Sequence, residues 1–323
     1  MPNIIRQTFI IMSTICFASL TFAQSSFPER PIMLVHPYAA GGPADIMARA
    51  LARQMEVRLK QPVIVEAKAG GSATIGTGQV ARAKPDGYTL LLGTSAGHVV
   101  TPLMQRIPYD GIGDFSFIAV VANQPNVLVA HPSLGVDKLQ DMVALARKQP
   151  GILNYASAGT GGATHLGAEA FAQAAQIKIT HIPYSGAAPA MKDLLSGQVQ
   201  LGMLNLAATK AFVSEGRLKA LAYGGTKSTP LLPNVPTLSQ LGYPATAAST
   251  WYTLAAPKGT PVEVIETLHK VVTEARKDNT YLAVLEGMGA EQLDLTPGET
   301  TAFVKQDKVA MISLLTHLHL LAK

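Results

Sequence analysis

Small and hydroxyl-bearing residues in glycine-rich turns are the strongest candidates for chemistry in this chain. The richest turn runs from Ser157 to His165 and contains three glycines and two threonines. Glycines let the backbone approach a ligand closely, and N–H groups at the start of a helix attract anions without a cationic side chain. The turn therefore predicts an anion site, to which Ser157, Thr160 and Thr164 can donate hydroxyl groups.

The same turn lacks the features of the common phosphate-binding motifs. No Lys followed by Ser or Thr comes at the P-loop spacing, and Thr164 stands where the dinucleotide fingerprint has its third glycine. We interpret His165 as a structural residue at the helix start rather than as a ligand. The pattern favours a small anion, and we expect no cofactor.

A second turn, from His36 to Asp45, also lies between a predicted strand and a predicted helix. Gly41 and Gly42 free the backbone, and Pro43 preorganises the first helical turn. Asp45 has two interpretations. It is either a first-turn acid that complements the helix dipole, or a polar contact to a ligand hydroxyl, amine or bound water.

A third turn, Gly93-Thr94-Ser95-Ala96-Gly97, has the G-x-S-x-G pattern of a hydrolase nucleophile elbow and follows a predicted strand. A serine hydrolase also needs an acid and a histidine oriented by that acid. The late histidines, His269, His317 and His319, all fall in predicted helices. We therefore favour a small-residue loop that faces the same ligand cleft as the other two turns, and we predict no catalytic residue.

Composition excludes several classes of protein. The chain has 323 residues, of which 48% are hydrophobic and 15% charged, enough apolar mass for a folded core. Lys and Arg exceed Asp and Glu by 26 − 21 = 5 but form no run, so no nucleic-acid partner is expected. The histidines lack HxxxH and HExxH spacings, so no metal site is predicted. No apolar stretch reaches ~18 residues, which argues against a permanent transmembrane helix.

Residues 1–23 have the pattern of a secretory signal peptide. Arg6 lies in the basic start, Thr8 to Leu20 is apolar, and Thr21-Phe22-Ala23 offers small residues for cleavage. A buried N-terminal helix is the alternative. The single cysteine, Cys16, falls inside this segment, so the mature chain would have no disulfide, thiolate catalyst or cysteine-based metal site. We expect a periplasmic protein.

Apolar runs of strand length alternate with segments of helix length. The predicted strands are Ile32–His36, Pro62–Glu66, Tyr88–Leu92, Phe115–Val121, Asn126–Ala130, Ile152–Ala156, Ile179–Pro183, Val199–Leu204, Leu218–Ala222 and Trp251–Ala256. The predicted helices are Pro43–Leu59, Asp137–Lys148, Thr164–Ala175, Ala187–Leu195, Pro261–Lys277 and the amphipathic segment Gly298–Leu321. Continuous apolar strands separated by helices are typical of α/β proteins whose parallel sheets are covered on both faces.

Motifs along the mature chain resemble those of Bug-type solute receptors, the extracytoplasmic binding proteins of tripartite tricarboxylate transporters. The similar segments are Phe27–Ile32, Pro37–Asp45, Pro62–Glu66, Lys84–Leu90, Pro108–Asp110, Tyr155–Gly159, His165–Leu166, Ile182–Gly186, Pro233–Leu238 and Ala256–Pro261. They cover nearly the whole mature chain in order, and their combination is more specific than any single motif.

The resemblance implies an α/β, type II-like periplasmic binding fold with two lobes. Each lobe would be a largely parallel sheet flanked by helices, with the ligand cleft between the lobes. The first lobe would comprise residues 24–123 plus 247–323, and the second would comprise residues 124–246.

The resemblance also implies the ligand contacts, because in this family the glycine-rich turns hold one carboxylate through backbone amides, hydroxyls and bridging waters. By position, the first-lobe wall would consist of Tyr38, Ala40, Gly41, Gly42 and Asp45. The second-lobe site would consist of Ser157, Gly159, Thr160, Gly161, Gly162 and Thr164, with Tyr184 and Ser185 nearby. Thr94, Ser95 and Asn205 are further candidates, and Trp251 is either hinge packing or a ligand platform.

The implied function is capture without chemistry. The receptor, a monomer, would bind an aromatic or aliphatic mono- or dicarboxylate, such as a terephthalate-, nicotinate- or citrate-like acid. It would deliver this acid to the small and large membrane permease subunits of a tripartite tricarboxylate transporter. A ligand-sensing subunit for a receptor kinase is an alternative, as is the serine hydrolase. Departures from the family pattern at Ser72-Ala73, His36 and Gln200 affect the expected ligand rather than the fold.

Overall fold

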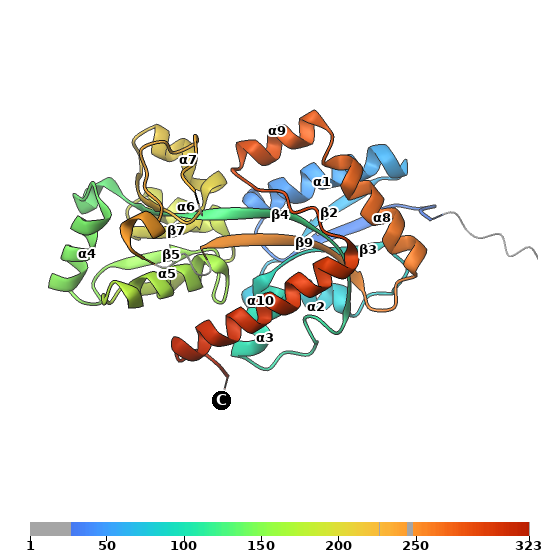
Figure 1. Cartoon of the computed structure of the whole chain (residues 1–323), viewed down its shortest axis with the longest axis horizontal. Coiled ribbons are helices and arrows are strands. Elements are labelled where there is room, and N and C mark those ends of the chain that lie inside the picture. Colours follow the sequence, from blue (N-terminus) through green and yellow to red (C-terminus); the bar gives the residue numbers. More distant parts are fainter. Residues whose placement is uncertain (1–26, 226, 244–247, 323) are drawn as a thin grey trace, which may run out of the picture.

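The computed structural model describes residues 27–225, 227–243 and 248–322. The predicted signal peptide, residues 1–23, and the predicted lobe boundary at residues 246 and 247 lie outside these ranges. Two lobes lie side by side and are joined by two long strands, β4 and β9 (Figure 1). This arrangement confirms the predicted two-lobed α/β class.

The first lobe is built on a sheet with the strand order β2-β1-β3-β9-β4. Its strands are β1 (Ile32–His36), β2 (Val63–Ala67), β3 (Thr89–Thr94), β9 (Ser249–Pro257) and the first half of β4 (Phe115–Ala130). Its helices are α1 (Pro43–Leu59), α2 (Thr74–Ala81), α3 (Thr101–Met104), α8 (Val262–Ala275), α9 (Asn279–Gly287) and α10 (Pro297–His317). One core cluster joins α1, α8 and α9 to the sheet, and another joins α2 and α10 to it.

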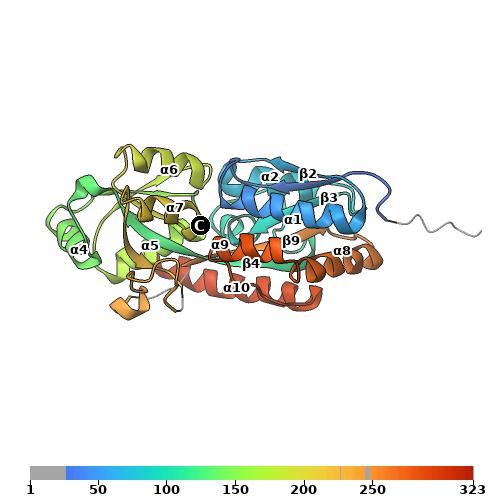
Figure 2. The same ribbon diagram turned by 90° about the horizontal axis from the view of Figure 1, so that it is seen from above.

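The second lobe contains the other half of β4, which pairs with both β7 and β8. The lobe continues from β7 through β5 to β6. Its strands are β5 (Asn154–Ser157), β6 (Thr180–Pro183), β7 (Leu201–Asn205) and β8 (Lys219–Tyr223), and its helices are α4 (Leu139–Lys148), α5 (Ala163–Ala174), α6 (Ala187–Leu195) and α7 (Leu206–Ser214). Figure 2 shows that α10 runs along one side of the first lobe toward the second. There the Gln173 side chain in α5 donates to the His317 carbonyl, 3.2 Å away.

The sheets are less uniformly parallel than the resemblance implies. The outer strands are parallel, in the pairs β1–β2, β1–β3, β5–β6 and β5–β7. The pairs that involve β4 or β9 are antiparallel. The reason is geometric, because β4 leads from the first lobe to the second and β9 leads back. The two strands must therefore run in opposite directions.

Strand β4 is continuous where the sequence predicts two strands, Phe115–Val121 and Asn126–Ala130. Pro125 lies in the gap between the two predicted strands, and proline cannot donate a ladder hydrogen bond. In the structure Pro125 pairs with Ser249, the first residue of β9, whereas Asn126 begins the pairing with β7. Proline therefore sits where β4 changes partners, at the crossing between the lobes.

Helix α1 follows directly from its sequence. Met47, Leu51 and Met55 recur every four residues, and all three are fully buried. This spacing places them on one face of the helix, where they pack against the sheet and against α8 and α9. Gly42 and Pro43 begin the helix at the predicted residue, which fixes the position of the preceding turn.

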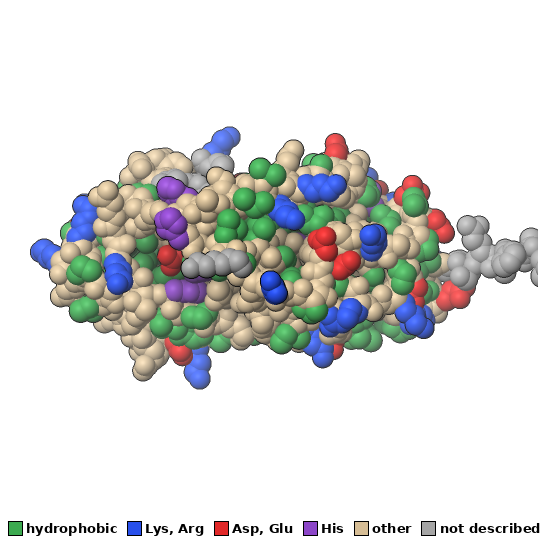
Figure 3. Space-filling model, turned by 90° about the horizontal axis from the view of Figure 1, so that it is seen from below, with side chains coloured by type: hydrophobic (Ala, Val, Ile, Leu, Met, Phe, Trp, Pro, Cys, Tyr) green, Lys and Arg blue, Asp and Glu red, His purple; other side chains and the backbone are tan. Residues whose placement is uncertain are grey.

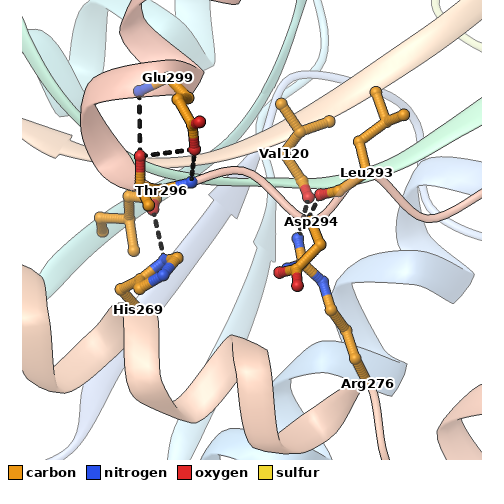
Figure 4. Close-up of polar contacts among 8 residues, drawn as sticks. Val120, His269, Arg276, Leu293, Asp294, Thr296 and Glu299 are labelled. Atoms are coloured by element: carbon orange, nitrogen blue, oxygen red, sulfur yellow. Dashed lines mark hydrogen bonds and ion pairs between the residues drawn. The ribbon is translucent and has the colours of Figure 1, made fainter.

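Two irregularities in β4 are held by side chains from α8 and the residue after it. The register against β9 shifts between Phe117 and Ala119 and again between Val120 and Ala122. Nδ1 of His269 lies 3.0 Å from the Ile118 carbonyl, and Arg276 donates to the Val120 carbonyl at 2.7 Å (Figure 4). Bulges expose carbonyl groups that the ladder no longer pairs, so these side chains satisfy them.

Arg276 also donates to the Leu293 carbonyl at 2.6 Å and pairs with Asp294. A capping box between Thr296 and Glu299 then starts α10 (Figure 4). These contacts fix the segment that leads into α10, and thereby the helix that extends toward the second lobe.

The surface shown in Figure 3 carries acidic and basic side chains interspersed, with apolar side chains between them. Within the described residues, no helix combines the length and the apolar character that crossing a membrane requires.

Candidate ligand-binding site

A cavity of about 360 Å³ lies between the lobes. The first lobe contributes residues 37–39, 42–44, 70–73 and 94–96, and β9 contributes Thr250 and Tyr252. The second lobe contributes residues 158–160, 162–164, 183–185, Ala187 and Asn205. Within the described part of the chain, these lining residues include no Lys, Arg, Asp, Glu or His. Any charge on a ligand would therefore meet neutral groups.

The starts of four helices reach this wall. The cavity is lined by the first residues of α1, α5 and α6 and by Asn205, which precedes α7. Within the described residues, no N-cap side chain makes a capping hydrogen bond at any of the four helix starts. Uncapped N–H groups and the positive end of the helix dipole favour an anion, so the cavity is suited to a carboxylate.

The turns before α1 and α5 have the same backbone shape. Gly41 and Gly161 are left-handed, with φ angles of 80° and 75°. Gly42 and Gly162, which follow them, are extended N-cap residues. A side chain from each helix's first turn then accepts the N–H of the left-handed glycine. The acceptor is Asp45 Oδ2 at 3.0 Å in the first lobe. In the second lobe it is His165 Nδ1 at 3.1 Å.

Asp45 is turned away from the cavity. Its carboxylate contacts His36 Nε2 at 3.2 Å, Arg49 Nε at 3.0 Å and the Gly41 N–H at 3.0 Å. Burial raises the pKa of Asp45, but hydrogen bonds from Arg49, Gly41 and His36 outweigh it and hold the pKa below its usual value. Asp45 therefore organises the first turn from behind.

Ser157 is also directed inward. It is fully buried, and its Oγ lies 2.6 Å from His181 Nε2 and accepts the Gly159 N–H at 3.2 Å. Thr164, by contrast, lines the cavity, and its Oγ1 accepts the Ala158 N–H at 3.0 Å. Hydroxyls at both ends of the second turn are thus engaged in shaping it.

Ser95 lines the cavity but lacks the partner that a nucleophile needs. Its hydroxyl donates to Asp307 Oδ2 at 2.5 Å rather than to a histidine. His98, three residues further on, is buried and directs Nδ1 at the Gly111 carbonyl, 2.7 Å away. Among the described residues, the G-x-S-x-G turn therefore has no Ser–His pair.

Polar and aromatic groups form the remaining walls. The Tyr38 hydroxyl lies 2.7 Å from Thr94 Oγ1, and the Tyr184 hydroxyl donates to Asp193 at 2.8 Å. Burial raises the pKa of Tyr38, and burial together with Asp193 raises that of Tyr184 to about 12. Both rings therefore present neutral surfaces to the cavity at neutral pH.

Asn205 lies where the lobes meet. Its Nδ2 donates to Asn126 Oδ1 at 3.0 Å and to Thr250 Oγ1 at 3.1 Å. These three residues come from β7, β4 and β9, so they tie together the strands at the crossing. Across the cleft, the Ala39 N–H donates to the Ser185 carbonyl at 2.9 Å, which brings the two lobes into direct contact.

The structure places most predicted site residues around one cavity. The predicted residues that line it are Tyr38, Gly42, Ser95, Gly159, Thr160, Gly162, Thr164, Tyr184, Ser185 and Asn205, together with the further candidate Thr94. Five others do not line it: Asp45, Ser157 and Gly161 are buried, whereas Ala40 and Gly41 are exposed to solvent. Trp251 packs in a core cluster beside its cavity-lining neighbours.

One segment of the wall, residues 70–73, was absent from the predicted site. Ser72 and Ala73 have φ angles of 54° and 74°, a left-handed conformation that non-glycine residues rarely adopt. The signal was present in the sequence, because Gly70 and Gly71 follow a predicted strand as Gly41 and Gly42 do. From the sequence, Ser72 and Ala73 are identified only as a departure from the family pattern.

Comparison with known proteins agrees with this geometry. Residues 47–319 match the model of the tripartite tricarboxylate transporter family receptor. Protein BugT of Bordetella pertussis is 36% identical over 284 residues, covering 87% of each chain.

Three solved structures are also similar. The periplasmic binding protein BugD is 34% identical with a TM-score of 0.87, covering 92% of this chain and 100% of its own. An R. palustris protein with adipate, Rpa4515, is 31% identical with a TM-score of 0.87, and the match covers 91% of this chain and 98% of that one. MatC of Rhodopseudomonas palustris with bound malate is 27% identical with a TM-score of 0.85, and the match covers 90% of this chain and 100% of that one. The chain therefore belongs to the Bug-type family of tripartite tricarboxylate transporter receptors, which are periplasmic solute-binding proteins.

Proposed function

We propose that this receptor captures a small organic carboxylate in the cavity between its lobes and releases it, chemically unchanged, to a tripartite membrane permease. One observation carries the proposal: four uncapped helix starts reach a cavity whose described lining has no ionisable Asp, Glu, Lys, Arg or His. Neutral dipoles of this kind can stabilise an anion and still allow its reversible release.

The ligand class follows from the walls and from the relatives. The lining combines small residues with the rings of Tyr38, Tyr184 and Tyr252. Similar proteins were solved with adipate and with malate. We therefore propose an aliphatic or aromatic mono- or dicarboxylate, with terephthalate-, nicotinate- and citrate-like acids also among the candidates.

The predicted residues that line the cavity are the proposed ligand contacts, and the predicted residues that do not line it are proposed to act by shaping the turns. The proposed lobes are residues 24–123 plus 247–323 and residues 124–246. Residues 1–23 are the proposed cleavable signal peptide, which would deliver a monomeric receptor to the periplasm. Closure around the ligand would present both lobes together to the small and large permease subunits.

A thermal-shift panel tests the proposal. We expect at least one strong stabiliser among adipate, malate, citrate, nicotinate and terephthalate, because a ligand that binds only the folded state raises the melting temperature. The panel also includes carboxylate esters, and we expect no release of alcohol from them.

A charge introduced into the cavity gives the matched test. Thr160 lines the second turn, so Thr160→Asp places a carboxylate beside the bound acid and abolishes the thermal shift. Thr280→Asp adds the same charge at an exposed position in the first turn of α9 and keeps the shift. Equal responses in the two variants, or ester turnover without any acid-induced shift, would reject the proposed function.

A further inference from the structure

Both glycine-rich turns are closed by a side chain four residues after the left-handed glycine. Asp45 does this for Gly41, and His165 does it for Gly161. The two acceptors are equally buried but differ in charge: Asp45 is paired with Arg49, whereas burial lowers the pKa of His165 to about 4 and leaves the ring neutral at pH 7. The shared geometry indicates a shared task, performed with different chemistry.

The hydrogen bond at Gly161 defines the state of the histidine ring. A backbone N–H is always the donor, so His165 Nδ1 must be unprotonated and its proton must reside on Nε2. Nε2 lies 3.9 Å from Glu169 Oε1, on the side of the ring away from the turn. This hydrogen bond can form only while His165 is neutral with this tautomer.

A second histidine holds the other end of the same turn. The rings of His165 and His181 are stacked with centroids 4.0 Å apart. His181 Nε2 contacts the Ser157 hydroxyl, which accepts the Gly159 N–H. Tyr155 stacks on His181 at 4.9 Å and donates to Glu169 at 2.6 Å. One ordered cluster thus supports the turn at both Gly159 and Gly161.

We propose that His165 is a positioning residue for ligand capture: with His181 stacked against it, it holds the second turn in its binding shape, as Asp45 holds the first. This inference rests on the proposed function for its effect on affinity. Holding the Gly161 N–H inward leaves the start of α5, from Gly162 onward, directed at the cavity.

Low pH would disturb the second turn by protonating these histidines. Burial lowers the pKa of His165 to about 4, and burial followed by repulsion from His165 lowers that of His181 to about 3. Tyr155, His181 and Glu169 are the titratable groups in contact with the cluster, and Glu169 is the acidic one. Protonation of His165 Nδ1 replaces an acceptor with a donor, which breaks the bond to Gly161.

Two isosteric substitutions separate positioning from simple packing. His165→Asn keeps an acceptor atom at the position of Nδ1, whereas His165→Leu has a similar shape without an acceptor. With adipate as the probe in titration calorimetry at pH 7, we expect His165→Asn to stay within about threefold of wild type. We expect His165→Leu to weaken binding roughly 10- to 100-fold, as the loss of one buried hydrogen bond implies. His131→Asn, in a second-lobe loop away from the cavity wall, is the matched control.

The pH profile adds a readout that a merely structural role would not change. Adipate's own protonation is common to both proteins and cancels in the ratio of wild-type to His165→Asn affinity, which therefore reports on His165 and its coupling to His181. We expect this ratio to fall as the pH is lowered from 7 toward 4. A constant ratio would overturn the proposal.

Two measurements require no ligand and keep the inference separate from the proposed function. In hydrogen exchange, we expect the Gly161 amide to lose protection in His165→Leu and to keep it in His165→Asn. In the wild type, nitrogen NMR of the imidazole should find the His165 proton on Nε2. Equal protection in both variants, or a proton on Nδ1, would overturn the inference. Failure of wild type to bind adipate, with the exchange pattern intact, would count against adipate as the ligand instead.

Discussion

At the scale of single residues, the sequence pattern predicts which turns line the cavity better than it predicts which side chains face it. The positions of Thr160 and Gly162 in the cavity wall were predictable, because small residues before a helix leave N–H groups exposed whatever the surroundings. Asp45 left two interpretations open, since its sequence position does not determine the direction of its carboxylate. That direction depends on His36 and Arg49, which contact it in the folded chain.

The first prediction concerns the stability that Asp45 provides. Asp45→Ala leaves the buried His36 ring and the Gly41 N–H without an acceptor, so we expect the free energy of unfolding to fall by about 2–3 kcal/mol. Arg49→Ala removes only a partner whose side chain is 61% exposed, and should cost less than about 1 kcal/mol. Urea unfolding of both variants checks this, and equal losses would contradict the proposed role of Asp45.

At the scale of elements, local pattern predicted the outer parts of the fold best. Strand β1 and helices α1 and α6 have the predicted bounds, because each has a clear apolar period and a turn on either side. Four helices were not predicted: α2, α3, α7 and α9. The antiparallel pairing of β4 and β9 was not foreseen, because an apolar run carries no information about strand direction. Strand β4 continues through Pro125 because it exchanges β9 for β7 as its pairing partner there. That exchange depends on tertiary structure and cannot be predicted from local sequence.

The second prediction concerns the irregular part of β4. The Arg276 side chain is 7% exposed and donates to the Val120 and Leu293 carbonyls. Arg276→Met leaves these acceptors unpaired, and we expect it to lower the free energy of unfolding by about 3 kcal/mol.

Arg217→Met is the matched control for this change. The Arg217 side chain is 53% exposed and pairs with Glu215, so its loss should cost less than about 1 kcal/mol. Chemical denaturation of both variants makes the comparison. A loss at Arg276 no larger than that at Arg217 would show that these bonds do not stabilise the β4 irregularities.

At the scale of the whole molecule, two lobes share two crossing strands, and the cavity exists only where both lobes contribute walls. The Ala39–Ser185 hydrogen bond and the reach of α10 toward α5 show the lobes in contact. The two-lobed class was predictable through the family resemblance. Its contacts across the cleft were not, because they join residues that are far apart in sequence.

The third prediction concerns stability against pH. Burial lowers the pKa values of His98 and His165 to about 4 and of His181 to about 3, whereas an unfolded histidine titrates near 6.5. Below pH 6.5 the unfolded chain therefore binds protons that the native state does not. The free energy of unfolding should be highest above pH 6.5 and fall toward pH 4, by up to roughly 1.4 kcal/mol per pH unit for each histidine.

Urea unfolding at pH 7, 6 and 5 measures this slope. His98→Phe removes one of the three histidines, and the new ring lies in a cluster that already contains Phe115 and Phe117. Unfolding of this variant should take up about one proton fewer, so its free energy of unfolding should fall less steeply as the pH is lowered. Stability that stays constant or rises between pH 6.5 and 5 would be incompatible with three neutral, buried histidines.

The measurement that tests the central claim most directly is a calorimetric titration of the wild-type protein with adipate and, in parallel, with its uncharged diamide. If neutral backbone dipoles from two lobes hold an anion, the acid binds with one site per chain and the diamide does not bind. Thr160→Asp then removes the heat of binding, while Thr280→Asp retains it. Equal binding of acid and diamide, or acid binding that survives Thr160→Asp, would contradict the account.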